Sequence, residues 1–143
     1  MTFKVEDCIF FQLAKASQVG ARFWSSCVAK LNLTAVQAMV LNFLGQEDEI
    51  TAVELGKRTA LDSATLTGVL DRLETAGILE RTRHPDDRRA INICLTDQGH
   101  ALASEVYATG ITANETFLSI LEAKERTMLH ALLDKVRHNG AGV

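Results

Sequence analysis

Apolar residues recur every three or four positions over residues 4–31. This spacing is typical of one face of an amphipathic helix, and no proline interrupts it. A helix of that span is roughly 40 Å long, which exceeds what the core of a small domain requires. We therefore expect part of this helix to pack against a second copy of the chain.

Three shorter helices follow, each opened by residues that can cap a helix end: Thr34 with Gln37, Thr51 with Glu54, and Asp62 or Ser63. The pattern predicts helices over residues 35–44, 52–59 and 64–76. Gly45 and Gly77 are expected to end the first and third helices, because glycine tolerates the left-handed backbone found there. The acidic residues 47–49 are expected to form a loop.

The third of these helices has a polar surface that begins with small side chains. Its apolar residues share one face, which leaves four candidate contact residues on the other faces: Ser63, Thr65, Thr67 and Arg72. Serine and threonine can hydrogen-bond bases or phosphates, and arginine can bind guanine through two hydrogen bonds. Residues 51–76 fit a helix-turn-helix unit, whose second helix enters the DNA major groove.

Two extended segments, 78–83 and 90–95, flank the only proline and predict a β-hairpin with a charged tip. The hairpin carries four arginines, which are candidate DNA contacts: Arg81, Arg83, Arg88 and Arg89. Against two aspartates they give residues 81–89 a charge of +2. Such a tip can be merely solvated, but arginine suits phosphates and narrow minor grooves, and this tip follows a helix-turn-helix pattern.

The last part of the chain again has a helical pattern. Thr96 is expected to cap a helix that runs to about residue 121, and a further helix is predicted over residues 123–137. The tail, residues 139–143, is expected to fray.

The length and composition of the chain limit the classes of protein to which it can belong. A chain of 143 residues, 47% hydrophobic, predicts one folded domain over residues 1–143. A net charge of -3 argues against general adhesion to nucleic acid. Three widely spaced cysteines indicate a reducing cytoplasm, and no apolar stretch is long enough to predict a membrane span. No motif of an enzyme, a metal site or a cofactor site is found, so none of these is expected.

Three segments resemble the MarR family of bacterial regulators: Leu61-Asp62-Ser63-Ala64-Thr65-Leu66-Thr67, Leu73-Glu74-Thr75-Ala76-Gly77-Ile78-Leu79, and Pro85-Asp86-Asp87-Arg88-Arg89 through Leu95-Thr96-Asp97-Gln98-Gly99. The resemblance implies a mainly α, winged helix-turn-helix fold with a small β-hairpin. It implies a homodimer with dimerisation helices at 1–31 and 97–138, and a DNA-binding lobe over 34–96. Arg89 would enter the minor groove and Asp87 would hold a neighbouring arginine in place.

Within this family, residues 61–67 are closest to the organic-hydroperoxide-sensing repressors. Those proteins sense oxidation through a cysteine near the start of the first helix and nearby tyrosines. Cys8 lies in that region and is the candidate redox residue. However, matching the first helix to the family pattern places Phe10 at the sensor position, and residues 33–38 contain no tyrosine. Peroxide sensing is therefore an alternative input.

The resemblance also implies a pocket for a small aromatic ligand between the dimerisation helices and the DNA-binding lobe. Its candidate lining residues are Phe10, Phe11, Phe23, Trp24, Met39 and Phe43. Residues of these types at helical spacing more often form a plain core, which is the alternative interpretation. The predicted function is a sequence-specific regulator of transcription that binds a pseudo-palindromic operator in double-stranded DNA, a repressor released by a ligand or an oxidant. The alternative is a winged helix that binds another protein without binding DNA.

Overall fold

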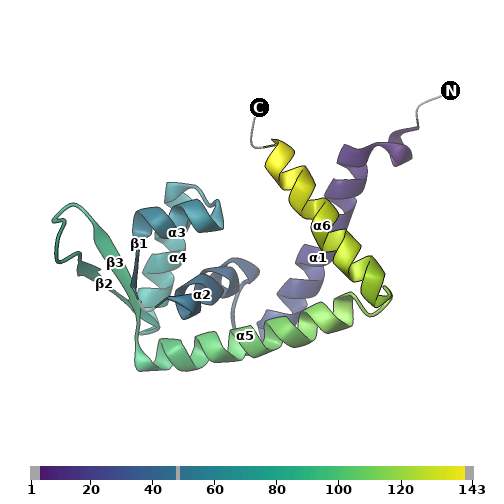
Figure 1. The fold of residues 1–143 in the computed structure, drawn as a ribbon. Helices are drawn as coiled ribbons and strands as arrows, with labels where there is room; N and C mark the ends of the chain where they lie inside the picture. The colour runs from purple at the N-terminus through teal and green to yellow at the C-terminus, as the bar shows by residue number, and fades with distance from the viewer. Residues whose placement is uncertain (1–3, 48, 141–143) are drawn as a thin grey trace.

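The computed structural model describes residues 4–47 and 49–140. In chain order its elements are η1 (Val5–Asp7), α1 (Ile9–Val28), η2 (Ala29–Leu31), α2 (Ala35–Gln46), β1 (Glu49–Thr51), α3 (Ala52–Thr59), α4 (Ser63–Thr75), β2 (Leu79–Arg83), β3 (Ile91–Leu95), α5 (Asp97–Phe117) and α6 (Ala123–Gly140). Residues 35–95 form one lobe, called the winged lobe below, and α1, α5 and α6 extend away from it (Figure 1). The predicted mainly helical fold with a small β-hairpin is confirmed.

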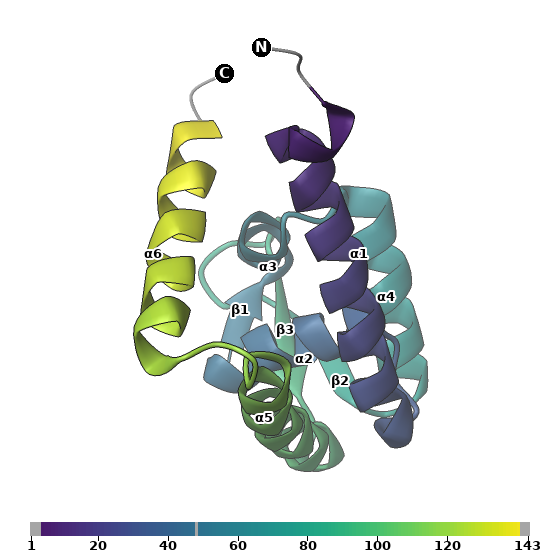
Figure 2. The ribbon, with the colours of Figure 1, turned by 90° about the vertical axis from the view of Figure 1, so that its right-hand side faces the viewer.

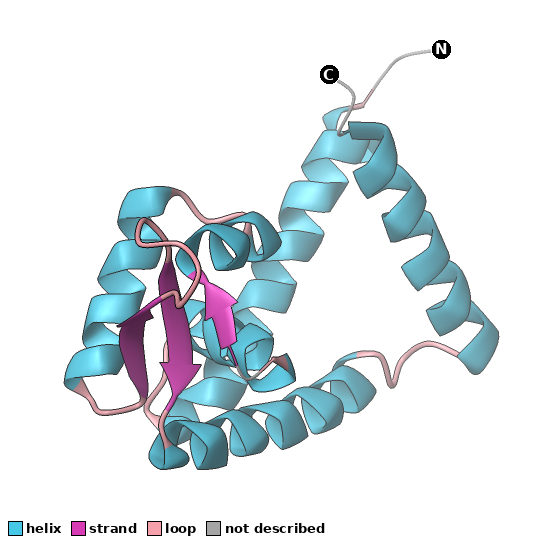
Figure 3. Cartoon of the chain, turned by 60° about the vertical axis from the view of Figure 1, so that its left-hand side comes forward, coloured by secondary structure: helices cyan, strands magenta, loops and turns pink. Residues whose placement is uncertain are grey.

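The sheet of the winged lobe has three antiparallel strands in the order β1-β3-β2. Strands β2 and β3 form the predicted hairpin, in a register that places Arg81 opposite Ile93. The sheet lies on one side of the lobe, with the helices behind it (Figure 3). The prediction of an acidic loop over residues 47–49 is wrong at Glu49, because Glu49–Thr51 forms strand β1, which pairs with β3 and buries Ile50.

The helices α2, α3 and α4 begin directly after the predicted capping residues. Thr34 and Gln37 form a complete capping box, in which each side chain accepts a hydrogen bond from the other residue's backbone amide. Thr51 caps α3 by accepting from the amide of Glu54, and the carboxylate of Glu54 instead binds Arg58. Between the two candidates for α4, the cap is Asp62. These local hydrogen bonds satisfy amides that a helix start leaves free.

Four predicted helix boundaries are wrong. The first helix is not continuous, because the backbone at Cys8 is extended and separates η1 from α1. Gly45 does not end α2, which continues to Gln46. A Cβ at this position would lie 3.2 Å from the Cβ of Ala103, so the glycine provides room for α5. Helix α5 ends at Phe117, and α6 extends to Gly140, so residues 139 and 140 are helical; residues 141–143 lie outside the described residues.

The hydrophobic core lies in the winged lobe and reaches α1 and α5. Its largest fully buried side chains are Leu41, Leu44, Leu55, Leu73, Leu79, Ile93, Val28, Val40 and Val106. Burial of this kind contributes about 25 cal/mol for each Å² of apolar surface removed from water. The core therefore fixes α4 and the hairpin to the scaffold of α2, α3 and α5.

A tight joint connects the end of α4 to the start of α5. The hydroxyl of Thr96 donates a hydrogen bond shared between the carbonyls of Gly77 (2.7 Å) and Ile78 (3.1 Å), and accepts one from the amide of Gly99 (3.1 Å). Gly77 has φ +75°, as predicted for the residue that ends α4. Gly99 is required for a different reason, because a Cβ there would lie 1.9 Å from the carbonyl oxygen of Ile78.

Apolar side chains on α1 and α6 remain exposed in the single chain. Among the described residues, α6 buries none, and its exposed apolar side chains are Met128, Leu132, Leu133 and Val136. The start of α1 exposes Ile9, Phe10 and Phe11. The outer ends of α1 and α6 lie toward the same end of the molecule (Figure 2). These surfaces have the character of an uncovered interface.

No single helix among the described residues is long and apolar enough to cross a membrane. Residues Ile9–Leu31 and Ala35–Gln46 reach that length and composition only as a pair, with a bend of 75° between them.

Candidate nucleic-acid interface

Helix α4 presents a polar outer surface above an apolar inner face. Leu66, Val69, Leu70 and Leu73 are buried. The four residues predicted to contact DNA are all exposed: Ser63, Thr65, Thr67 and Arg72. Asp62 caps the helix by accepting hydrogen bonds from the amide and the hydroxyl of Thr65, at 2.8 and 2.7 Å. These bonds, the backbone one first, hold the pKa of Asp62 below its usual value.

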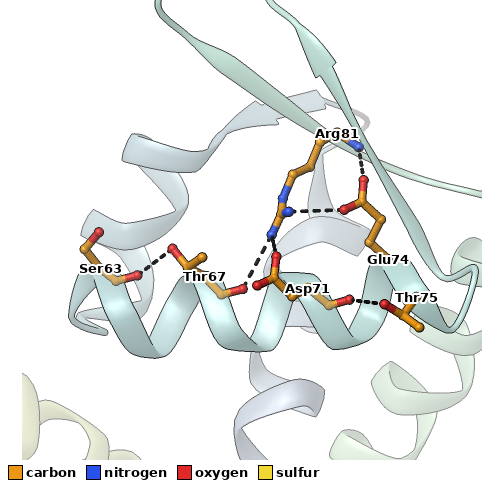
Figure 4. Close-up of polar contacts among 6 residues, drawn as sticks. All are labelled: Ser63, Thr67, Asp71, Glu74, Thr75 and Arg81. Atoms are coloured by element: carbon orange, nitrogen blue, oxygen red, sulfur yellow. Dashed lines mark hydrogen bonds and ion pairs between the residues drawn. The ribbon is translucent and has the colours of Figure 1, made fainter.

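Arg81 joins strand β2 to α4. Its Nη2 lies 2.6 Å from Oδ1 of Asp71 and its Nη1 lies 3.1 Å from Oε2 of Glu74. Nη2 also donates to the carbonyl of Thr67 at 3.4 Å, and the backbone amide of Arg81 donates to Glu74 at 3.3 Å (Figure 4). The side chain of Arg81 is only 27% exposed. Its guanidinium is therefore occupied within the chain.

The sequence pattern groups Arg81 with the other wing arginines and does not identify Asp71 and Glu74 as its partners. Asp71 and Glu74 are three residues apart, so they lie on one side of α4. That spacing was a visible signal, but their partner lies on another element, which the sequence pattern does not specify.

The other three wing arginines differ from Arg81. Arg83, Arg88 and Arg89 are exposed, and within residues 4–47 and 49–140 none of them forms an ion pair. Asp87 binds the backbone amide of Arg89 at 2.9 Å, while the carbonyl of Asp87 accepts from the amide of Ala90 at 3.1 Å. Asp87 thus binds a nearby arginine, Arg89, through the backbone amide of that residue and not through its guanidinium.

Arg58, at the end of α3, is a further cation that is occupied within the chain. It pairs with Glu47 at 2.6 Å and with Glu54 at 3.1 Å. The hydrogen bonds to Glu47 and then Glu54 raise the pKa of the Arg58 guanidinium. This cluster ties α3 to the segment that precedes β1.

Cys8 is half-buried immediately before α1, and its backbone amide donates to the carbonyl of Val5. No disulfide forms among the described cysteines, which are Cys8, Cys27 and Cys94. The neighbouring Phe10 side chain, at the position that the family pattern assigns to the sensor, is 79% exposed.

The structure does not gather the six predicted pocket residues. Phe23 and Trp24 line a hollow of about 240 Å³ together with Phe117, whose ring centroid lies 5.1 Å from that of Phe23. Phe10 and Phe11 lie exposed at the start of α1, and Phe43 packs against the hydrophobic core. Met39 is half-buried on α2.

A second hollow, which the sequence did not indicate, lies between α2 and α5. It has a volume of about 310 Å³ and is lined by Asn42, Gly45, Gln46, His100, Ala103, Ser104 and Tyr107. The Oδ1 of Asn42 is buried and has no hydrogen-bond partner among the described residues. An unsatisfied buried acceptor is uncommon in folded proteins.

Comparison with known proteins identifies the family. The MarR family model matches residues 33–91. The HTH-type transcriptional regulator TtmR of Methylorubrum extorquens is 35% identical over 137 residues, which cover 89% of this chain and 70% of that protein. The chain belongs to the MarR family. A second MarR-like relative is the organic hydroperoxide resistance transcriptional regulator of Bacillus subtilis, 33% identical over 99 residues, covering 69% of this chain and 67% of that one.

Solved structures agree with the MarR assignment. A mutant MarR from E. coli complexed with operator DNA matches with a TM-score of 0.83 and 31% identity, covering 90% of this chain and 92% of that chain. Bordetella bronchiseptica BpsR, whose DNA binding is regulated by 6-hydroxynicotinic acid, matches with a TM-score of 0.88 and 28% identity over 96% of this chain and 98% of that chain.

The predicted winged helix-turn-helix fold, the family and the function as a DNA-binding transcriptional regulator are confirmed. MarR-family regulators bind duplex DNA as dimers, so the two predicted macromolecular partners, DNA and a second copy of the chain, are confirmed at the level of the family.

Proposed function

We propose that this regulator is a cytoplasmic repressor that binds a pseudo-palindromic operator as a dimer. Helix α4 enters the major groove, and the wing tip, residues 83–90, enters the adjacent minor groove. The observation that carries the proposal is the set of exposed, unpaired arginines at the described wing tip, Arg83, Arg88 and Arg89, beside the polar surface of α4. Arginine suits the negative potential of a narrow minor groove.

The dimer would be formed by the exposed apolar surfaces of α1 and α6. A molar mass of about 31 kDa by light scattering, twice the 15.6 kDa of the chain, is expected at micromolar concentration. A mass equal to one chain would contradict the dimer.

Selection of bound sequences from randomised duplexes tests the proposal directly. We expect a two-fold symmetric consensus with half-sites about 34 Å apart, one helical turn of DNA. The Arg89→Ala variant should fold normally and bind the selected duplex more weakly. If no sequence is enriched, the protein-interaction module becomes the better explanation. If a sequence is enriched but Arg89→Ala binds it as tightly as the parent protein at every salt concentration, the proposed contact of the wing with DNA is wrong.

For the input, we propose that a small effector occupies the hollow between α2 and α5. The unpartnered Oδ1 of Asn42 supports this, because it offers a hydrogen-bond acceptor to a ligand. 6-Hydroxynicotinic acid, which regulates BpsR, is a suitable probe. It should weaken operator binding by this protein but not by an Asn42→Leu variant. Equal weakening of both proteins, or of neither, would contradict this site.

The oxidant alternative rests on Cys8. Cumene hydroperoxide should release the operator from the parent protein and not from a Cys8→Ser variant. If the variant responds equally, Cys8 is not the sensor.

A further inference from the structure

The threonine hydroxyl protons on helix α4 are already committed within the chain. The hydroxyl of Thr65 donates to Oδ2 of Asp62 at 2.7 Å, and the hydroxyl of Thr67 donates to the backbone carbonyl of Ser63 at 2.8 Å. Thr75 donates in the same way to the carbonyl of Asp71 (Figure 4). A hydroxyl has one proton and two lone pairs. The exposed threonine oxygens of this helix therefore offer only lone pairs to an outside partner.

This restriction determines which DNA groups the threonines can bind. Phosphate oxygens, N7 and O6 of guanine and O4 of thymine are all acceptors, so they cannot pair with an acceptor-only oxygen. The donors in the major groove are N6 of adenine and N4 of cytosine. Only these amino groups complement Thr65 and Thr67 as they are oriented here.

The carboxylate of Asp62 strengthens the restriction at Thr65. It is bound by the amide and the hydroxyl of the same residue, and hydrogen bonds to an ionised group are the stronger ones. The start of a helix usually attracts phosphate, but here a negative charge already occupies that position. Ser63 differs, because its hydroxyl makes no hydrogen bond within the described chain and remains free to donate.

We propose that Thr65 and Thr67 are specificity residues that read the exocyclic amino groups of adenine or cytosine, and not phosphates or guanine. This inference rests on the proposed function, in which α4 enters the major groove. It assigns the donor-bearing bases to the threonines and leaves guanine and phosphate to the arginines and Ser63.

Substitution with valine tests the hydroxyls, because valine keeps the shape of threonine and removes the oxygen. After selection with the parent protein, the selection is repeated with Thr65→Val, Thr65→Ser, Thr67→Val and the matched control Thr75→Val, which loses the same type of bond farther from the helix start. Thr65→Val and Thr67→Val should each relax the consensus at a defined base pair, and the modified duplexes described next show whether the amino group of that pair is read. Thr65→Ser should retain the parent preference, and Thr75→Val should leave the consensus unchanged.

A modified duplex tests the same point without any variant. Replacing a read adenine with purine nucleoside, or a read cytosine with its analogue lacking the amino group, removes one hydrogen-bond donor. The parent protein should then bind about fivefold more weakly, while the valine variant at that position should be indifferent.

Three results would overturn the inference: valine variants that relax no base pair, a parent protein that is indifferent to the missing amino group, or a valine variant that weakens all sequences equally, as loss of a phosphate contact does. A parent protein that enriches no sequence at all would instead overturn the proposed function, and this inference with it.

Discussion

The guanidinium of Arg81 lies 2.6 Å from the carboxylate of Asp71 and thereby links the first wing strand to α4, the helix proposed to read DNA. A single half-exposed ion pair contributes little to stability. Here the same guanidinium also binds Glu74 and the carbonyl of Thr67, which fixes the angle between β2 and α4. It also compensates two of the three acidic residues between positions 62 and 75. Arg81 is thus a positioning residue in the proposed interface.

Arg81→Ala should weaken operator binding although Arg81 does not reach DNA, because α4 would lose its fixed angle to the wing. The dissociation constant measured across a range of salt concentrations separates this role from a phosphate contact. Arg89→Ala should lower the salt dependence by about one released ion, whereas Arg81→Ala should leave the slope unchanged. Arg137→Ala, which removes a charge from α6, is the control. An equal drop in slope for Arg81→Ala would mean that Arg81 contacts phosphate.

Gly68→Ala should stabilise the protein and weaken its binding to DNA. Nothing lies within 4 Å of a Cβ added at this position, so no packing within the described chain requires glycine. Alanine in a helix interior is favoured by about 0.5–1 kcal/mol, which chemical denaturation would detect. Gly68 is turned away from the buried face of α4, so the added methyl would face the DNA. Gly140→Ala, whose added Cβ would also lie in open space, should not alter the affinity for DNA. If Gly68→Ala also leaves that affinity unchanged, position 68 does not face DNA in the complex.

Gly99→Ala should be strongly destabilising. The added Cβ would lie 1.9 Å from the carbonyl oxygen of Ile78, which belongs to the backbone and cannot rotate away. We expect a loss of about 3 kcal/mol in the free energy of unfolding, measured with urea. Gly56→Ala is the control, because its Cβ would meet Leu66 at an ordinary 3.6 Å. Equal stability of the two variants would show that the joint is looser than described.

Stability should depend on pH through Asp62. Its pKa is lowered in the folded protein by the hydrogen bonds from Thr65, so the folded state binds protons less readily than the unfolded state, where the usual value of 3.8 applies. The carboxylate therefore stabilises the fold above that value, and the benefit is lost as pH falls through the lowered pKa. The stability difference between the parent protein and Asp62→Asn should shrink on acidification from neutral pH to about pH 3. A difference independent of pH would contradict the role of this charge.

The features predicted correctly from the sequence are those that neighbouring residues determine. The caps at Thr34, Thr51 and Thr96 depend on a side chain and an amide three residues later, so their spacing is visible in the sequence. Strand β1 was missed because its three residues are held by pairing with β3, more than forty positions away.

Other errors have the same physical origin. Gly45 looked like a helix end, but its small size serves a contact with Ala103 on α5. The partners of Arg81 lie seven and ten positions back on another element, and the candidate pocket residues share a helical period without sharing a cavity. In each case the structure depends on a contact between two elements, which the spacing of residues along the chain does not reveal.

Because Thr96 and Gly99 connect the start of α5 to the end of α4, a rotation of α5 moves α4 with it. The 21 residues of α5 give an arm of roughly 32 Å, rigidly joined to the end of α4. A tilt of about 10° at the far end would sweep α4 through roughly 5 Å, a large fraction of the ~12 Å width of the major groove. In the proposed DNA complex, a small change of angle where two chains meet would thus be amplified into a loss of register on DNA, with no rearrangement inside either winged lobe.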